Sequence, residues 1–291
     1  MAAYFRPPTL AEALSLVAPG RALRGLAVGA GGTDIYAARA GGPPAPAILD
    51  ITGIPALGAV ERSADGWRIG ATARWSDIHL HPDLPPVFDA LRAAAGSIGS
   101  VQIRNAGTVA GNICGAAATA DGIPPLLAMD ALVELQDLAG SRRCPLASFV
   151  AGGQAGLRPG ELVTAILVPH REPPDPAGCS AFGRLAARRH LAPVIANLAV
   201  VLHLSGGRVA AAGIAVGGCG AQACRLPALE TALQGRRLAA GLAGLAETAD
   251  LAPLAPVDDA LAPAAYRRAA VPVLLRRLLL ELAGDGRGAA A

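Results

Sequence analysis

The sequence has 291 residues, of which 53% are apolar, and a formal net charge of +3. This length predicts two domains, each large enough to bury its own core. All 25 basic residues are arginine, which excludes a lysine Schiff base, a lysine general base and a Walker-type phosphate loop. The small net charge and the 3% of aromatic residues argue against a nucleic-acid-binding surface.

Five cysteines are scattered along the chain, an odd number that argues against a disulfide framework. The N-terminus has no basic segment followed by an apolar run, so no secretory leader is predicted. The most apolar candidate span, residues 271–283, is interrupted by two arginines and a glutamate, so no membrane span is predicted either. We therefore expect a reducing, cytoplasmic setting.

Helices and strands are expected to alternate in the first half of the chain. Thr9 and Glu12 have the spacing of a capping box, and Leu10, Leu14 and Val17 lie on one helical face, which predicts a first helix. The further elements expected are a strand at 26–30, a helix at 33–39, strands at 47–51 and 67–71, and a helix at 84–95.

The second half is predicted to contain a domain boundary. Residues 102–121 are rich in small and polar residues without periodicity, which predicts irregular backbone, and four prolines at 169–178 indicate a linker. The domains are therefore expected at 1–172 and 178–285, the second being a smaller α+β unit. The remaining elements expected are a helix at 124–129, a strand at 131–136, a hairpin of strands 194–204 and 208–216, and a closing helix at 266–283.

A first glycine-rich segment, residues 28–34, follows a predicted strand. Its small residues allow successive backbone N–H groups to approach an anion, so a phosphate-bearing ligand fits. A strand-to-helix turn also needs glycine for conformational reasons, which is the alternative explanation. The candidate ligand-binding residues of this segment are Val28, Gly29, Ala30, Gly31, Gly32, Thr33 and Asp34.

A second segment, residues 102–112, repeats this pattern with hydroxyl and amide donors and is followed by an isolated carboxylate, Asp121. Two such loops can hold opposite sides of a diphosphate. Thr108 is suited to donate to a phosphate oxygen, and Asp121 to bind a sugar or ribityl hydroxyl. Asn105 and Asn112 fit either a ligand-binding role or a turn. The candidates of this segment are Ile103, Asn105, Thr108, Ala110, Gly111 and Asn112.

The order of these motifs resembles the FAD-binding flavoprotein subunit of molybdenum hydroxylases, the family of xanthine dehydrogenase and carbon monoxide dehydrogenase. The resemblance rests first on residues 30–34 (AGGTD), 103–105 (IRN) and 108–112 (TVAGN). It extends, in the family's order and over nearly the whole chain, through residues 47–51, 69–71, 160–162, 166–169, 266–268 and 276–277.

This resemblance implies an α+β fold: a vanillyl-alcohol-oxidase-like (PCMH-type) FAD-binding domain of two α/β subdomains, and a small C-terminal α/β domain of the CO dehydrogenase flavoprotein type. FAD would lie between them, with its diphosphate held by residues 30–34 and 108–112. Cys114, Gly115 and Asp121 would lie along the rest of the cofactor.

The resemblance also assigns roles near the flavin ring. Leu167 would lie near the isoalloxazine. Arg184 stands where many relatives carry a lysine, and its charge would stabilise reduced, anionic flavin. The alternative for Arg184 is a solvated arginine at a strand end. Two departures from the family pattern are Ala110 in place of a glycine, whose methyl would loosen one diphosphate contact, and the alanine-rich residues 115–120 in place of a more polar stretch.

The implied function is electron transfer within an oxidoreductase complex. A molybdopterin-binding large subunit would oxidise the substrate, and a small subunit would pass the electrons through two [2Fe–2S] clusters. The FAD of this chain would deliver them to NAD or to another acceptor such as a quinone. No metal is expected in this chain, because Cys219 and Cys224 lack the four-cysteine spacing of a cluster.

Two alternatives come from the same glycine-rich segments. Gly29, Gly31 and Asp50 have the spacing of a Rossmann-type NAD-dependent dehydrogenase, although Asp34 stands where that motif needs its third glycine. A cofactor-free scaffold or assembly subunit is compatible with Ala110 and with the lack of polar side chains nearby. A third alternative, a metal hydrolase, depends on His79, His81 and Asp83, which also fit an ordinary surface loop.

Overall fold

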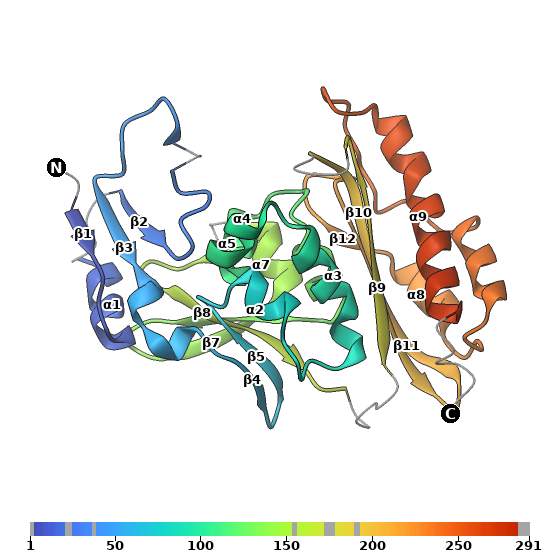
Figure 1. Ribbon diagram of the computed structural model, residues 1–291, viewed down its shortest axis with the longest axis horizontal. Helices are drawn as coiled ribbons and strands as arrows, with labels where there is room; N and C mark the ends of the chain where they lie inside the picture. The colour runs from blue at the N-terminus through green and yellow to red at the C-terminus, as the bar shows by residue number, and fades with distance from the viewer. Residues whose placement is uncertain are drawn as a thin grey trace. The chain divides into compact units, whose positions relative to one another are not determined.

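The computed structural model describes residues 3–20, 25–36, 39–152, 156–171, 178–188 and 193–284. The chain divides into two compact units (Figure 1). Unit 1 comprises Met1–Ile78, Ser100–Ala116 and Ala131–Pro169, and unit 2 comprises His79–Gly99, Ala117–Asp130 and His170–Ala291. The chain therefore enters unit 2 twice before residue 170. Most of the expected linker, 172–177, lies outside the described residues, and a division into domains at 1–172 and 178–285 stays a prediction.

A parallel three-stranded sheet in unit 1 leads into the first glycine-rich segment. Its strands, in spatial order, are β1 (Ala3–Phe5), β3 (Ala47–Asp50) and β2 (Leu26–Gly29). Gly29 and Asp50, the last residues of β2 and β3, are partners in the register. The helix α1 (Leu10–Val17) begins after Thr9, whose hydroxyl accepts a hydrogen bond from the backbone N–H of Glu12, which confirms the N-cap half of the predicted capping box. The Thr9 hydroxyl also donates to the Glu12 carboxylate at 3.1 Å.

The second sheet of unit 1 is antiparallel. Its order is β4 (Val60–Ser63), β5 (Gly66–Gly70), β8 (Leu162–Pro169), β6 (Leu132–Gln136) and β7 (Ser141–Pro145). The short helical elements of this unit are η2 (Ile51–Gly53), η3 (Pro55–Leu57), α2 (Trp75–His79), α4 (Val101–Ala106), α5 (Val109–Gly115) and α7 (Leu146–Gly152). Helix α5 packs against β8, and its Ile113 is fully buried. The second glycine-rich segment is therefore packed against the core of unit 1 through α5.

A largely buried ion pair joins Arg142 of β7 to Glu161, the residue before β8. Arg142 donates from Nε and Nη2 to the two carboxylate oxygens of Glu161 at 2.6 and 2.7 Å, and the backbone N–H of Arg158 donates to Glu161 at 2.7 Å. These hydrogen bonds, chiefly those from Arg142, lower the pKa of Glu161 below its ordinary value of 4.5. Because the Glu161 side chain is 3% exposed and accepts two parallel charge-assisted bonds, this ion pair contributes more to stability than an exposed one.

We expect Glu161→Gln to lower the free energy of unfolding by about 2 kcal/mol at neutral pH. Because the pKa of Glu161 is lower in the folded than in the unfolded state, its contribution is present above the unfolded pKa and is lost as the pH falls through the folded one. Urea unfolding of the two proteins should therefore differ at pH 7 and converge below pH 4.5. A stability difference that is independent of pH would contradict this assignment.

A long antiparallel sheet forms the centre of unit 2. Its order is β12 (Cys224–Arg225), β11 (Arg208–Gly217), β10 (Val194–Ser205) and β9 (Cys179–Ala186). Gly206 and Gly207 join β10 to β11 with φ of 56° and 70°, the left-handed conformation of a two-residue hairpin turn. The predicted hairpin is confirmed.

Helices cover both faces of this sheet. They are α3 (Asp89–Ser97), α6 (Ile123–Ala128), α8 (Pro227–Leu233), η6 (Ala240–Ala246) and α9 (Ala264–Gly284). Leu198 and Val200 of β10 belong to the same buried cluster as the leucines of α9, which confirms the predicted closing helix. Helix α3 lies on the opposite face (Figure 1), where the N–H of Ala90 donates to the hydroxyl of Ser180 in β9. Among the described residues, no helix is long and apolar enough to cross a membrane.

The structure corrects the prediction of a helix at 33–39. Residues 33–36 form a turn, and 37–38 lie outside the described part of the chain. Gly32, at a φ of 70°, turns the chain directly after the strand. The first glycine-rich segment is therefore not followed at once by a helix whose dipole would favour an anion.

Residues 102–121, predicted to be irregular, contain the helices α4 and α5. Each is capped by a hydroxyl, since Ser100 accepts from the N–H of Ile103 and Thr108 from the N–H of Gly111. Helices this short are stabilised by caps and tertiary contacts, so the sequence shows no helical period. The helix predicted at 84–95 begins later, because the residue before a proline disfavours the helical conformation: Pro85 is extended, and η4 (Pro86–Phe88) precedes α3.

Candidate functional site

The two glycine-rich segments are in contact within unit 1, although about 75 residues separate them in the sequence. A Cβ atom on Gly31 would lie 2.0 Å from the carbonyl oxygen of Ala106 and 2.8 Å from the Cα of Gly107. A Cβ on Gly107 would in turn meet the hydroxyl oxygen of Thr33 at 3.5 Å. Any side chain at residue 31 would overlap the backbone of the second segment. The two backbones thus form one side-chain-poor cradle.

Buried residues hold the second segment in place. The backbone N–H of Trp75 donates to the carbonyl of Gly107 at 3.1 Å, and the N–H of Val109 donates to the carbonyl of Ala73 at 3.0 Å. Trp75 is 2% exposed, so the segment is attached to the core of unit 1. Thr108 is also buried, and its hydroxyl oxygen caps α5 by accepting from Gly111 at 3.1 Å. This bond uses an acceptor lone pair and leaves the hydroxyl hydrogen available to donate.

One polar atom in this region is buried without a partner among the described residues. The side-chain oxygen of Asn112 on α5 has no hydrogen bond there. Buried polar atoms in folded proteins normally have partners, so this orphan fits an atom that accepts from a bound ligand. Ala110 is 4% exposed, so its methyl group is buried instead of protruding into solvent.

Several candidates of these segments are exposed. Val28 is 46% and Ile103 is 39% exposed, although both are apolar, while Asp34 and Asn105 are also at the surface. The remaining candidates of the first segment are Gly29, which is buried at the end of β2, and the half-buried Ala30, Gly31, Gly32 and Thr33. A surface of glycine backbone bordered by apolar side chains is suited to a ligand with both an anionic and an aromatic part.

The end of α5 carries Cys114 and Gly115. Burial raises the pKa of the Cys114 thiol to about 11, so this thiol stays neutral and is not a nucleophile at neutral pH. A Cβ on Gly115 would meet nothing within 4 Å. Ala116 then takes the left-handed conformation, at a φ of 46°, and ends the helix. Both predicted residues thus lie on the same helix as Asn112.

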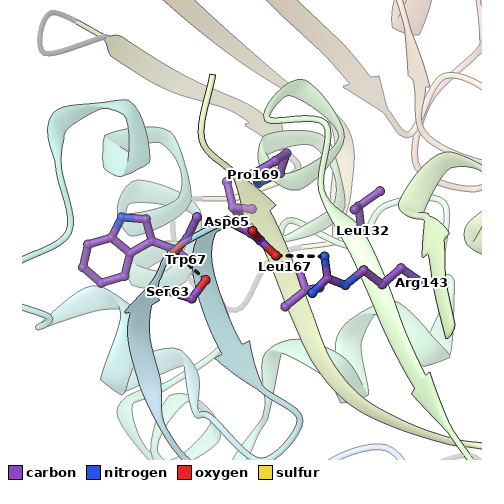
Figure 2. Close-up of a pocket in the computed structure, with 9 residues that line it drawn as sticks. Ser63, Asp65, Trp67, Leu132, Arg143, Leu167 and Pro169 are labelled. Carbon is purple, nitrogen blue, oxygen red and sulfur yellow. Dashed lines mark hydrogen bonds and ion pairs between the residues drawn. The ribbon is translucent and has the colours of Figure 1, made fainter. Parts of the chain in front are cut away.

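Leu167 lies in a separate shallow pocket of unit 1 (Figure 2). It is on β8, in register with Arg68 of β5. Arg143 and Asp65, which also line the pocket, form an ion pair of 3.2 Å. No residue of either glycine-rich segment lines this pocket. The predicted place of Leu167 near the isoalloxazine therefore stays a prediction.

Asp121 and Arg184 meet in unit 2. The Arg184 Nε lies 3.6 Å from Asp121 Oδ2, and the Arg184 Nη1 donates to the carbonyl of Ser97 at 2.8 Å. The arginine side chain is 18% exposed, so it is not the solvated strand-end residue of the alternative interpretation. A third residue, Asn197, which the sequence did not single out, donates to Asp121 Oδ1 at 2.7 Å.

The carboxylate needed for a Rossmann-type dehydrogenase is already engaged. Asp50 accepts from the N–H of Thr52 at 2.8 Å and from its hydroxyl at 2.6 Å, and it also accepts from the hydroxyl of Tyr4. Arg6 adds an ion pair at 3.4 Å. Asp50 thus caps η2 and ties β1 to β3, which accounts for it without a ribose.

The histidines considered as metal ligands have local structural partners. His79 Nδ1 lies 3.2 Å from the carbonyl of Arg92, and His81 Nδ1 accepts from the N–H of Asp83 at 3.2 Å. Across the described residues, no group of three or more histidine, cysteine, aspartate or glutamate side chains is arranged to hold a metal ion.

Comparison with known proteins decides between these functions. Residues 1–171 match the family described as the FAD binding domain in molybdopterin dehydrogenase. The chain belongs to this family. Residues 181–282 match the CO dehydrogenase flavoprotein C-terminal domain, so the resemblance stated from the sequence is confirmed. This FAD-binding subunit is an oxidoreductase component of the molybdenum hydroxylase family.

Relatives align with this flavoprotein over almost its whole length. The nicotine 6-hydroxylase medium subunit of Paenarthrobacter nicotinovorans is 29% identical and covers 96% of each chain. The glyceraldehyde dehydrogenase medium chain of Sulfolobus acidocaldarius is 28% identical, over 96% of this chain and 98% of that one. The structure of carbon monoxide dehydrogenase from Hydrogenophaga pseudoflava superposes with a TM-score of 0.85 at 26% identity, over 98% of each chain. The predicted PCMH-type α+β fold is confirmed.

Proposed function

We propose that this chain passes electrons from the [2Fe–2S] clusters of a small partner subunit, through its own FAD, to NAD or another acceptor. A molybdopterin-binding large subunit would supply the electrons by oxidising the organic substrate. Family membership and the likeness to medium subunits support this assignment. Bound FAD can exchange electrons singly with iron–sulfur clusters and in pairs with a nicotinamide, which is the chemistry that such a subunit needs.

One observation carries the proposal: the backbone of Gly31 lies against that of Ala106 and Gly107. This contact creates a cradle from which side chains are absent, and a diphosphate can be bound there by main-chain N–H groups. The side-chain oxygen of Asn112, which has no partner among the described residues, can accept a hydrogen bond, and the Thr108 hydroxyl can donate one. The residues present fit FAD. We therefore assign its diphosphate to residues 30–34 and 108–112.

The other candidate residues receive supporting roles in the same proposal. Cys114 and Gly115 would contact FAD from the end of α5, and Asp121 would accept a hydrogen bond from one of its hydroxyls. Arg184 would place a positive charge where reduced flavin needs one. Because the alternative of a cofactor-free scaffold requires that none of these groups binds a flavin, the measurement of flavin content separates the two functions.

The test of FAD binding uses the full-length chain. We expect that denaturing the purified protein releases about one FAD per chain, measured by absorbance and fluorescence against standards. A chain that carries no flavin and takes up none when FAD is added would contradict the proposal. Uptake of NAD without flavin would favour the Rossmann-type dehydrogenase instead.

The electron acceptor is tested separately, in the complex purified with its partner subunits. If NAD is the acceptor, NADH should bleach the visible flavin absorbance under anaerobic conditions, since the transfer is reversible. If NADH leaves the flavin oxidised while a soluble quinone reoxidises chemically reduced flavin, NAD is excluded as the acceptor. The proposal of electron transfer through FAD fails only if neither compound exchanges electrons with it.

A further inference from the structure

We propose that Asn197 is a positioning residue for FAD, which acts by holding the carboxylate of Asp121 in place. This inference rests on the proposed function, in which Asp121 contacts FAD. It concerns a buried cluster of unit 2 formed by Asn197 on β10, Arg184 on β9 and the segment of residues 117–121 between α5 and α6.

Both donors of the Asn197 amide are directed at this one segment. Asn197 is completely buried. Its Nδ2 donates to Asp121 Oδ1 at 2.7 Å and to the carbonyl of Thr119 at 3.3 Å. A single amide therefore fixes both the backbone of the segment and the carboxylate at its end.

The orientation of this amide is determined by its surroundings. The Asn197 Oδ1 is buried without a hydrogen-bond partner among the described residues, and it would lie 2.2 Å from a Cβ on Gly217. Reversing the amide would remove the hydrogen bond to Asp121, since the amide oxygen would then face the carboxylate. An unpaired buried oxygen costs free energy. The amide keeps this orientation because its N–H groups bind Asp121 and Thr119.

Other contacts hold the same segment from the sheet. The backbone N–H of Gly218 donates to the carbonyl of Ala118 at 2.7 Å. Arg184 approaches the second oxygen, Asp121 Oδ2, at 3.6 Å. Each carboxylate oxygen thus has its own partner, an amide on Oδ1 and a guanidinium on Oδ2. The two partners lie on the neighbouring strands β9 and β10, which thereby fix the orientation of the Asp121 carboxylate.

The charge state of Asp121 depends on the same partners. Burial raises the pKa of Asp121 above its ordinary value, and the hydrogen bond from Asn197 and the charge of Arg184 offset part of that rise. An ionised carboxylate can only accept hydrogen bonds, so a hydroxyl of the ribityl chain that binds to it must act as the donor. Asn197 therefore favours the form of Asp121 that binds such a hydroxyl.

The substitution Asn197→Asp tests this role, because aspartate has nearly the shape of asparagine, lacks the amide donors and places a like charge beside the carboxylate of Asp121. In the full-length apo-chain, we expect it to raise the dissociation constant for FAD about tenfold, the usual effect of losing a hydrogen bond to a charged group. Flavin fluorescence during titration with FAD measures this constant. Asn197→Ala serves as the second variant should the aspartate protein fold poorly.

A double-mutant cycle separates positioning from a general effect on folding. In an Asp121→Ala background, Asn197→Asp should leave the dissociation constant unchanged, because the group through which it acts is gone. Ser180→Ala removes another buried polar side chain of the same sheet that hydrogen-bonds to Ala90 and Pro86. This control should lower the melting temperature without changing FAD affinity.

Two results would overturn the inference. One is an equal loss of affinity from Asn197→Asp with and without Asp121, and the other is an Asp121→Ala protein that binds FAD as tightly as the wild type. Both leave the proposed function intact, since the wild-type chain would still bind flavin. Failure of the wild-type chain to bind FAD would instead contradict the proposed function itself.

Discussion

Gly31→Ala is expected to raise the dissociation constant for FAD about 100-fold, a loss of roughly 2.7 kcal/mol of binding free energy. The added methyl carbon would lie 2.0 Å from the carbonyl oxygen of Ala106, which is main chain and cannot rotate away. The two segments must separate to admit it, and the cradle proposed for the diphosphate opens. Titration of the full-length apo-chain with FAD, followed by flavin fluorescence, measures the change.

A matched control is Gly42→Ala, in the same part of the chain. A Cβ on Gly42 would meet its nearest neighbour, the carbonyl oxygen of Arg39, at 3.6 Å, which is an ordinary contact. We expect FAD affinity within about twofold of the wild type for this variant, because surface changes away from such contacts are nearly neutral. Unchanged affinity in Gly31→Ala as well would show that the cradle does not bind FAD.

Arg267→Met is expected to lower the free energy of unfolding by about 3 kcal/mol, the scale for leaving two buried carbonyl groups without their charged donor. Arg267 on α9 is 3% exposed and donates from Nη1 to the carbonyls of Ile195 and Gly218, at 2.5 and 3.0 Å. Its Nη2 donates to Asp259 at 2.5 Å. Methionine fills the space but leaves both carbonyls without this donor.

The comparison variant is Arg276→Met on the same helix. The Arg276 side chain is 59% exposed and lies 3.8 Å from Glu247, so its loss should change stability by about 0.5 kcal/mol or less. Chemical denaturation of both proteins, monitored by circular dichroism, gives the two values. Equal stability losses in the two variants would mean that Arg267 does not anchor α9 to the sheet.

The sequence predicted the elements that have local signals. The N-cap Thr9 and the hairpin glycines Gly206 and Gly207 are each set by neighbouring residues, and the structure confirms both. The helices α4 and α5 were missed because their caps and tertiary contacts, and not an apolar period, stabilise them. The sequence predicts a helix at 33–39 because the residues after Gly32 are compatible with one. The structure has a turn at 33–36 instead, directly after Gly32 with its positive φ, which the sequence does not show.

Asn197 shows why part of the candidate site was beyond prediction. In the sequence it is one asparagine in a strand of apolar residues, where nothing nearby indicates its partners. Its hydrogen bonds go to Asp121 and Thr119, more than 75 residues away, and the glycine that makes room for its oxygen is Gly217 on the next strand. Such a cluster exists only after the strands have paired.

The sequence by itself determined the family and the cofactor through its resemblance to a known flavoprotein subunit over nearly the whole chain. The two segments that we assign to FAD are visible in the sequence because a main-chain anion site needs runs of small residues. The tertiary structure showed that no other residue fits at Gly31 and that Asp50 is a helix cap. It also showed that Arg184 and Asn197 hold Asp121. The physical reason is the range of the interactions: turns and caps act over a few residues, whereas close backbone approach and buried polar pairing depend on segments that only folding brings together.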